Sequence, residues 1–412
     1  MTITSSARRR RSLLRDGATG SPTRLDPVEL LMDLVFAFAI TELSALLLAQ
    51  PDLDTVLETG VLFVAVWWAW ICSVLANHGL NAERSRVRLL LFAQAGLGLL
   101  MACALPRAFA ADGALFAESV VVLQIGRTLV LLAAFGKGHP QTTRLLRRMT
   151  VWFSVSALLW IAGARAAPDD RLLLWAIAVA VEIGAVEIGF WVPGLGRSPR
   201  RDAAIDGERL GERCARFVTI VLGLSLLALA RQAVEAALSP PEWAALAIAF
   251  ATSAAIAWIH GNAGPSGAAR AAGAAAEPGR MSRASHTGVH LLVLAGIAVA
   301  ALGFQRLLAQ PRGSVELVLL LPLVGGPALF LLGNLWFKAL AWQRAPVSHL
   351  AGFALLAATV VVSSSLGPLG VGAAVAAILV MVAVGESAAL RRAPALPPPE
   401  PDRRSSLPAK IW

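Results

Sequence analysis

An apolar run near the N-terminus constrains this chain more than any other feature, because it carries acidic residues within a stretch of membrane-spanning length. The run is VELLMDLVFAFAITELS, residues 28–44. A membrane-spanning helix needs about 20 mostly apolar residues, and ionisable side chains inside it are costly unless they face protein or water. Residues three or four positions apart share one stripe of a helix, and here they are Glu29, Asp33, Phe36, Ile40 and Ser44. We therefore expect a polar stripe that faces the interior of a polytopic membrane protein.

The composition of the whole chain agrees with a membrane protein. Of its 412 residues 57% are hydrophobic and only 15% are charged, which is too little charge for a soluble domain of this size. Apolar runs recur almost to the end, and their lengths predict an all-α protein of about twelve transmembrane helices. The predicted spans are 28–49, 56–77, 87–105, 115–135, 149–164, 171–192, 213–231, 242–260, 288–308, 315–337, 348–366 and 369–389.

The basic residues predict the orientation. The formal charge is +10, which would suggest a nucleic-acid partner in a soluble protein, but here the basic residues lie in short loops, so we expect none. With a cytoplasmic N-terminus, about 28 Lys and Arg fall on the inner side, Lys338 among them, and 6, including Arg171, on the outer side. This is a strong positive-inside bias. We expect a protein of the inner (cytoplasmic) membrane, with the lipid bilayer as its partner and both termini cytoplasmic.

Short matches in the same order predict an internal repeat. Val87-Arg-Leu-Leu matches Val289-His-Leu-Leu, and Gly126-Arg127-Thr-Leu-Val-Leu-Leu matches Gly326-Pro-Ala-Leu-Phe-Leu-Leu. Glu29-x-x-x-Asp33 and Glu212-x-x-x-Arg216 open the first and seventh spans. An even number of spans per unit makes the two repeats parallel. The predicted domains are a basic cytoplasmic arm (1–26), a first six-helix repeat (27–192), a cytoplasmic linker (193–211), a second six-helix repeat (212–389) and a Pro-rich basic cytoplasmic tail (390–412).

Several of these segments resemble the low temperature requirement protein A (LtrA) family. The similarity covers residues from about 28 to about 340, and its most specific part is Gly-Phe-Trp-Val-Pro-Gly-Leu-Gly-Arg-Ser, residues 189–198. The resemblance also rests on Glu29–Thr41, Val66-Trp-Trp-Ala-Trp70, Gly126-Arg-Thr-Leu129 and Glu212-Arg213. It implies a bacterial multi-pass membrane protein linked to growth in the cold. The chain departs from the family pattern at Arg209, where the family has His, and at Leu224, where it has a membrane-embedded Glu.

Buried ionisable residues are the candidates for an ion pathway or a buried polar network. Arg127 lies near the middle of the fourth span, where an isolated Arg would cost at least about 2.5–3.5 kcal/mol, so it needs an acidic partner or a water-filled cavity. We expect Asp33 to be that partner, with Glu182 as the second choice; a purely structural ion pair is an equal alternative to a transport role. The full candidate set is Glu29, Asp33, Ser44, Arg127, Glu182, Glu212, Arg213 and His290.

Metal, cofactor and catalytic sites have little support in the sequence. Cys72, Cys103 and Cys214 lack metal-ligand spacing, and we expect small buried side chains. His286 and His290 stand four apart, as metal ligands on a helix can, but no third ligand is evident, so we expect His290 to be an interior hydrogen-bonding histidine. The segment 194–196 (Gly-Leu-Gly) lacks the context of a phosphate loop, and we expect a tight turn. No Ser/His/Asp or Cys/His arrangement indicates an enzyme.

Three classes of function remain. We expect a carrier or channel for a small ion or solute, with a site between the two repeats near the membrane midplane. The alternative is a membrane sensor or scaffold that transports nothing. An intramembrane lipid enzyme is the third class, and it would need a denser group of acids, bases or metal ligands than the scattered carboxylates supply.

Overall fold

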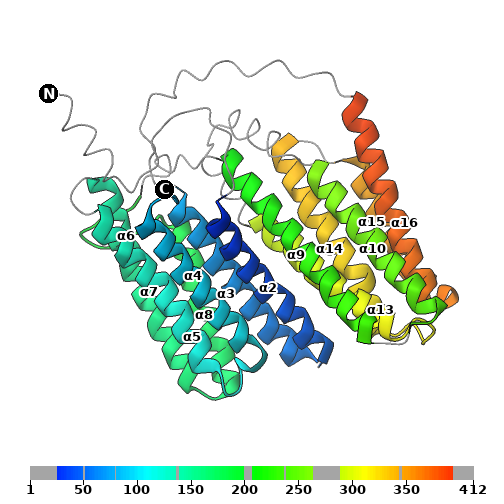
Figure 1. Cartoon of the computed structure of the whole chain (residues 1–412), viewed down its shortest axis with the longest axis horizontal. Helices are drawn as coiled ribbons and strands as arrows, with labels where there is room; N and C mark the ends of the chain where they lie inside the picture. The colour runs from blue at the N-terminus through cyan, green and yellow to red at the C-terminus, as the bar shows by residue number, and fades with distance from the viewer. Residues whose placement is uncertain are drawn as a thin grey trace. The chain divides into compact units, whose positions relative to one another are not determined.

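A computed structural model describes residues 26–49, 52–78, 80–135, 139–198, 207–235, 238–262, 288–342 and 346–392. Every named element in these ranges is a helix (Figure 1), which confirms the predicted all-α class for the described part of the chain. The helices of the N-terminal half are α2 (Pro27–Ala49), α3 (Leu53–Asn77), α4 (Ser85–Ala104), η1 (Leu105–Arg107), α5 (Gly113–Val121), η2 (Val122–Gly126), α6 (Arg127–Phe135), α7 (Pro140–Arg165) and α8 (Pro168–Glu187).

The described helices of the C-terminal half are also mostly long and apolar. They are α9 (Gly207–Glu235), α10 (Pro240–Asn262), α13 (Val289–Ala309), α14 (Leu317–Trp342), α15 (Val347–Val361) and α16 (Ser363–Arg392). Four of the described helices begin on proline, which lacks a backbone N–H that would be unpaired in the first turn anyway. These prolines are Pro27, Pro140, Pro168 and Pro240.

The chain divides into two compact units, and the division passes through two helices. One unit holds α2 up to Ala39, α3 from Val64, and α4 to α8; the other holds the remainder of α2 and α3 together with α9 to α16. In the second unit, two side-chain hydrogen bonds join the end of α2 to α13. Ser44 donates to the Ala298 carbonyl at 3.0 Å, and Arg306 donates to the Leu48 carbonyl at 3.2 Å.

Ten of the described helices are long and apolar enough to cross a membrane, so the chain is a multi-pass membrane protein. Each of the twelve predicted spans coincides with a helix, but α8 and α15 lie outside the ten. Helix α15 has only 15 residues, whereas the prediction gave it 19. The count of twelve and the parallel repeat therefore stay predictions.

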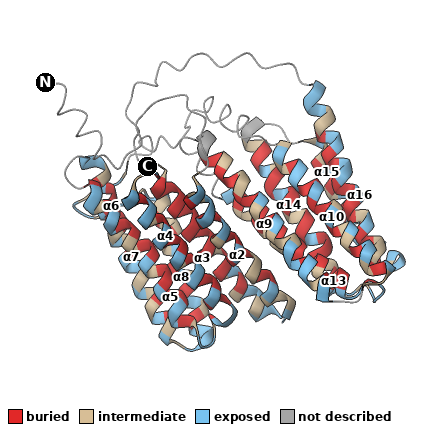
Figure 2. Cartoon of the chain, in the orientation of Figure 1, coloured by how far each residue is buried: buried red, intermediate tan, exposed pale blue. Residues whose placement is uncertain are grey.

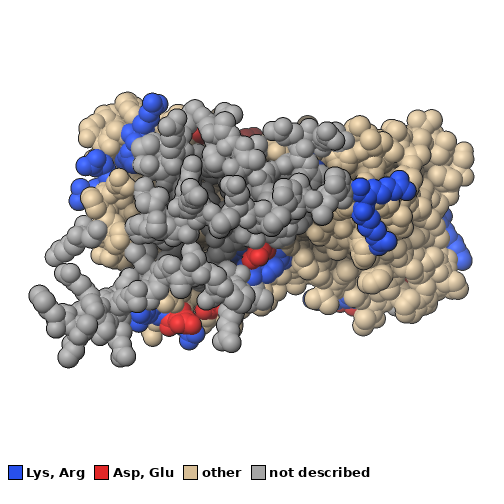
Figure 3. All heavy atoms as spheres, turned by 90° about the horizontal axis from the view of Figure 1, so that it is seen from above, with Lys and Arg blue, Asp and Glu red and all other residues tan. Residues whose placement is uncertain are grey.

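The surface of each unit suits a lipid environment. Figure 2 shows buried residues along one side of many helices and exposed residues along another. The exposed side chains include many large apolar ones, such as Leu158 and Leu227, which are 74% and 65% exposed. In Figure 3 most described atoms belong to uncharged residues, with Lys and Arg in small groups. Apolar side chains directed outward are expected where lipid replaces water.

Glycines bring α13 and α14 into close contact. A Cβ at Gly296 would lie 2.3 Å from the Phe330 nitrogen, and one at Gly326 would lie 2.3 Å from the Ala300 nitrogen. Neither distance leaves room for a methyl group, so only glycine permits the two backbones to touch here. Small residues at helix contacts are the usual device for packing in a membrane, where apolar burial gives little advantage over lipid.

Glycine also shapes the connection that follows α8. The prediction of a tight turn is confirmed: residues 193–195 form a turn, and Val192 bridges Gly196. Gly189, Gly194 and Gly196 have φ angles of 67°, 76° and 72°, which only glycine adopts without strain. Phe190 also has a positive φ, of 50°, and its side chain is buried, in edge contact with Phe153.

Some basic residues that the prediction placed in loops are buried instead, among them Arg148, Lys338 and Arg171. Lys338 lies within α14 with a fully buried side chain. Arg171, in the first turn of α8, donates to the Gly163 carbonyl at 3.1 Å and to the Ala108 carbonyl at 2.9 Å. It joins the start of α8 to the end of α7 and to the segment after η1, so its role is at least partly structural. The orientation of the protein in the membrane stays a prediction.

Candidate functional site

Glu182 is the centre of a buried polar network in the first unit. Glu182 lies in the second half of α8 and is only 2% exposed. One carboxylate oxygen accepts from the Ser156 hydroxyl at 2.8 Å and from the Trp160 indole N–H at 3.1 Å. The other accepts from the Gln124 side-chain amide at 2.7 Å. Three donors from two other membrane-spanning segments therefore satisfy both oxygens of Glu182.

Arg127 joins the same network through Gln124. Its guanidinium donates to the Gln124 side-chain oxygen at 2.5 Å and to the Ser73 hydroxyl at 2.8 Å. Gln124 thus accepts from Arg127 and donates to Glu182, so that one amide connects the positive and the negative charge. The arginine is 2% exposed, and its Nε has no partner within the described part of the chain.

A change of helix type places Gln124 in this network. The fourth predicted span is one rod from Gly113 to Phe135, but residues 122–126 are π-helical. Such a wider turn changes the direction of the side chains that follow, and it is frequent at functional sites. The Thr128 hydroxyl adds a local bond, because it donates to the backbone oxygen of Gln124 at 2.7 Å.

The predicted pair of Arg127 with Asp33 is wrong. The guanidinium bonds go to Ser73 and Gln124, while Asp33 accepts from the Trp70 indole N–H at 2.9 Å. Glu182, the second choice, is the acidic residue that Arg127 is connected to. The connection is indirect, because it runs through the side-chain amide of Gln124. The prediction chose Asp33 from its depth along its helix. In the structure, Arg127 instead hydrogen-bonds the neutral side chain of Gln124, which lies one turn earlier on the same segment.

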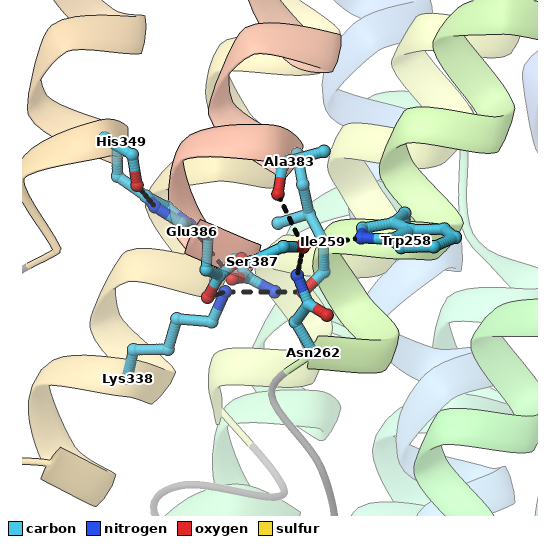
Figure 4. Close-up of polar contacts among 10 residues, drawn as sticks. Trp258, Ile259, Asn262, Lys338, His349, Ala383, Glu386 and Ser387 are labelled. Atoms are coloured by element: carbon cyan, nitrogen blue, oxygen red, sulfur yellow. Dashed lines mark hydrogen bonds and ion pairs between the residues drawn. The ribbon is translucent and has the colours of Figure 1, made fainter. Parts of the chain in front are cut away.

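A second buried network lies in the second unit, where α10, α14, α15 and α16 pack together (Figure 4). Lys338 of α14 forms an ion pair with Glu386 of α16, and their side chains are 0% and 2% exposed. The Lys338 ammonium also donates to the Ile259 carbonyl at 3.3 Å. Among the described residues, Lys338 is the one polar partner of Glu386, and the second carboxylate oxygen has no hydrogen bond.

Polar side chains from neighbouring turns surround this ion pair. His349 of α15 hydrogen-bonds the Asn334 side-chain oxygen of α14 at 3.1 Å. His260 of α10 meets the ring of His290 edge-on at 5.7 Å. Beside Glu386, Ser387 accepts from Trp258 at 2.8 Å and from Asn262 at 3.1 Å, as Figure 4 shows. The second unit therefore holds a buried ion pair with hydrogen-bonding side chains on neighbouring helix turns.

The structure places the other predicted residues as follows. Glu29 is half-buried in the first turn of α2, and Ser44 is buried, with its hydrogen bond to Ala298. In α9, Glu212 is half-buried and Arg213 is 5% exposed. His290 is 4% exposed and contacts the rings of His260 and Phe337, which makes it an interior histidine. Only Arg127 and Glu182 of the candidate set are joined by the hydrogen bonds described above.

Metal binding receives no support within the described ranges, where no group of three or more His, Cys, Asp or Glu could hold an ion. His286, the other half of the possible metal pair, lies outside the described residues, as does the side chain of Arg209. Leu224, which the sequence analysis named as a departure from the pattern of the resembled family, is half-buried in α9. Catalytic residues and cofactors were not expected, and this stays a prediction.

Sequence reasoning missed Gln124, Asn334, Lys338, His349 and Glu386. Glu386 did carry a signal, since it is an acidic residue four positions inside the last predicted span. Lys338 follows the predicted end of its span by one residue and therefore resembled a loop residue.

Comparison with known proteins assigns a family. The family model described as bacterial low temperature requirement A protein (LtrA) matches residues 24–384, which confirms the resemblance. An uncharacterized protein of Rhizobium meliloti (strain 1021), RA0937, is 35% identical over 363 residues, covering 88% of this chain and 89% of its own length. No solved structure matches the chain.

Proposed function

Since this chain belongs to the family of bacterial low temperature requirement A (LtrA) proteins, we propose that it moves a small ion or solute across the membrane, as a carrier or a channel. The finding that supports this proposal is the burial of charged side chains inside apolar helices. Each unit has its own set: Arg127 with Glu182 in the first, and Lys338 with Glu386 in the second.

The cost of such residues is the reason to infer a function. Translocon measurements give about 2.5–3.5 kcal/mol for one Arg, Lys or Asp at the centre of a helix. Well-packed apolar residues in place of a buried ion pair are often neutral or stabilising, so stability alone does not explain why the chain keeps these charges. Ionisable residues inside membrane helices commonly mark the path of an ion or solute.

The location of the transport site is the finer part of the proposal. The predicted site lies between the two repeats near the midplane, with the polar stripe of α2 along it. Asp33, which is 3% exposed, is the residue of that stripe with a carboxylate deep enough to contact a translocated ion.

A sensor or scaffold that transports nothing is the alternative. The observation that favours it is the leucine at position 224, where the family carries a membrane-embedded Glu, because a scaffold tolerates such a loss more readily than a transporter does. An intramembrane lipid enzyme is the third class and has no specific observation in its favour.

Ion flux into liposomes tests the proposal. Purified protein would be reconstituted and given gradients of K⁺, Na⁺ and protons in turn, with flux followed by entrapped fluorescent dyes. We expect flux above that of protein-free liposomes, a loss of flux in Asp33→Asn, and no change in Glu83→Gln, which alters an exposed carboxylate between α3 and α4. Folded protein that moves none of these ions would overturn the proposed ion transport and favour the sensor or scaffold over a channel for ions.

A further inference from the structure

The two buried carboxylates of the chain have different environments. Glu182 accepts three hydrogen bonds from neutral donors, so both of its oxygens have partners that do not depend on a neighbouring cation. Glu386 depends on Lys338: this ion pair is its one polar contact within the described residues, and one of its oxygens has no hydrogen bond. A carboxylate with a single polar partner is the better candidate for an exchange of ligands.

We propose that Glu386 is a proton-exchange site in which the Lys338 ammonium and a proton from water compete for the same carboxylate. This inference rests on the proposed transport function, since the exchanged proton would either be the transported ion or be coupled to the transport of another ion or solute. When the ammonium turns away, a proton adds to a Glu386 oxygen and forms an O–H bond. Lys338 keeps its own proton, so the cluster gains one positive charge, and that charge leaves when the proton departs and the ion pair closes again.

The depth of Lys338 permits this movement. Lys338 lies four residues before the end of α14, which is about 6 Å at 1.5 Å per residue. A lysine chain bridges such a distance by extending its ammonium to the membrane interface. The Ile259 carbonyl, near the end of α10, already accepts from the ammonium at 3.3 Å and offers it a second position.

The surrounding atoms favour a proton over a metal cation. Na⁺, K⁺ and divalent ions of the hard class prefer several oxygen ligands. The titratable side chains near this end of the helices that pack on α16 are nitrogen bases or cations: Lys338 of α14, His260 of α10, His349 of α15 and His290 of α13, with Arg391 and Arg392 at the end of α16 itself. The Asn334 oxygen is engaged by His349. Too few oxygens remain to replace the hydration shell of a metal ion.

Infrared difference spectroscopy tests the exchange without a transport assay. We expect acidification of the purified protein to produce the C=O stretch of a buried carboxylic acid. The band should be absent in Glu386→Gln, and it should appear at higher pH in Lys338→Met, because the competitor is gone. Glu182→Gln should leave it unchanged. A band that persists in Glu386→Gln, or that does not move in Lys338→Met, would overturn the proposal.

Two further measurements separate this inference from the proposed function. The double variant Lys338→Met/Glu386→Gln removes both charges, which keeps the interior neutral and the protein folded if either single variant fails; it should also lack the band. Proton flux into liposomes should be lost in Glu386→Gln. If the protein moves ions and this variant retains its proton flux, the exchange site is wrong while transport stands. If the band behaves as expected but no ion moves, the transport function is wrong.

Discussion

At the scale of single residues, Gln124 connects the two buried charged side chains of the first unit. Its side chain accepts from Arg127 and donates to Glu182, so the two charges are coupled although they do not touch. Removing one member of a buried charged set costs roughly 3–5 kcal/mol, because the other is left uncompensated. We expect Arg127→Leu and Glu182→Leu each to lower the melting temperature of the purified protein, and the double variant to lose less than the sum.

Arg127→Leu combined with Asp33→Leu is the matched comparison, and those two losses should add within a few tenths of a kcal/mol. If the losses of the Arg127 and Asp33 variants are not additive while those of the Arg127 and Glu182 variants are, the result would contradict the observed hydrogen bonds. The sequence supplied both charges of this network, because apolar surroundings make Arg127 and Glu182 conspicuous. It did not supply Gln124, since a neutral amide in a membrane helix has no periodicity or charge that distinguishes it from its neighbours.

At the scale of helices, the contact of α13 with α14 depends on glycine. A Cβ at Gly326 would lie 2.3 Å from a backbone nitrogen of α13, whereas Gly325 has nothing within 4 Å. Gly326→Ala must push the helices apart, and overpacking of this kind costs typically about 1–3 kcal/mol. Gly325→Ala should be neutral or stabilise by up to about 1 kcal/mol, because alanine is the better helix former. Thermal unfolding in detergent measures both, and equal melting temperatures would refute the close contact.

Element positions could be predicted well, because the length and spacing of apolar runs determine them. Features that depend on tertiary contacts could not. The π-helical turn at residues 122–126 has no signature in its sequence, and Lys338 resembled a loop residue because an apolar run ends just before it. Its burial follows from Glu386, which lies 48 positions later in the chain, so that neither residue alone predicts the pair.

At the scale of the whole molecule, the distribution of Lys and Arg predicts that both termini are cytoplasmic. Burial of Arg148, Arg213 and Lys338 removes three residues from the inner side of that comparison, and burial of Arg171 removes one from the outer side, so the strong inner excess remains. The basic residues near the ends of the spans set orientation because they resist translocation. We therefore expect a fluorescent protein fused after Trp412 to be bright and alkaline phosphatase at the same position to be inactive. A phosphatase fusion in the connection between α9 and α10 is the positive control and should be active. The reverse pattern, with phosphatase active after Trp412, would show that the chain has the opposite orientation or an odd number of spans.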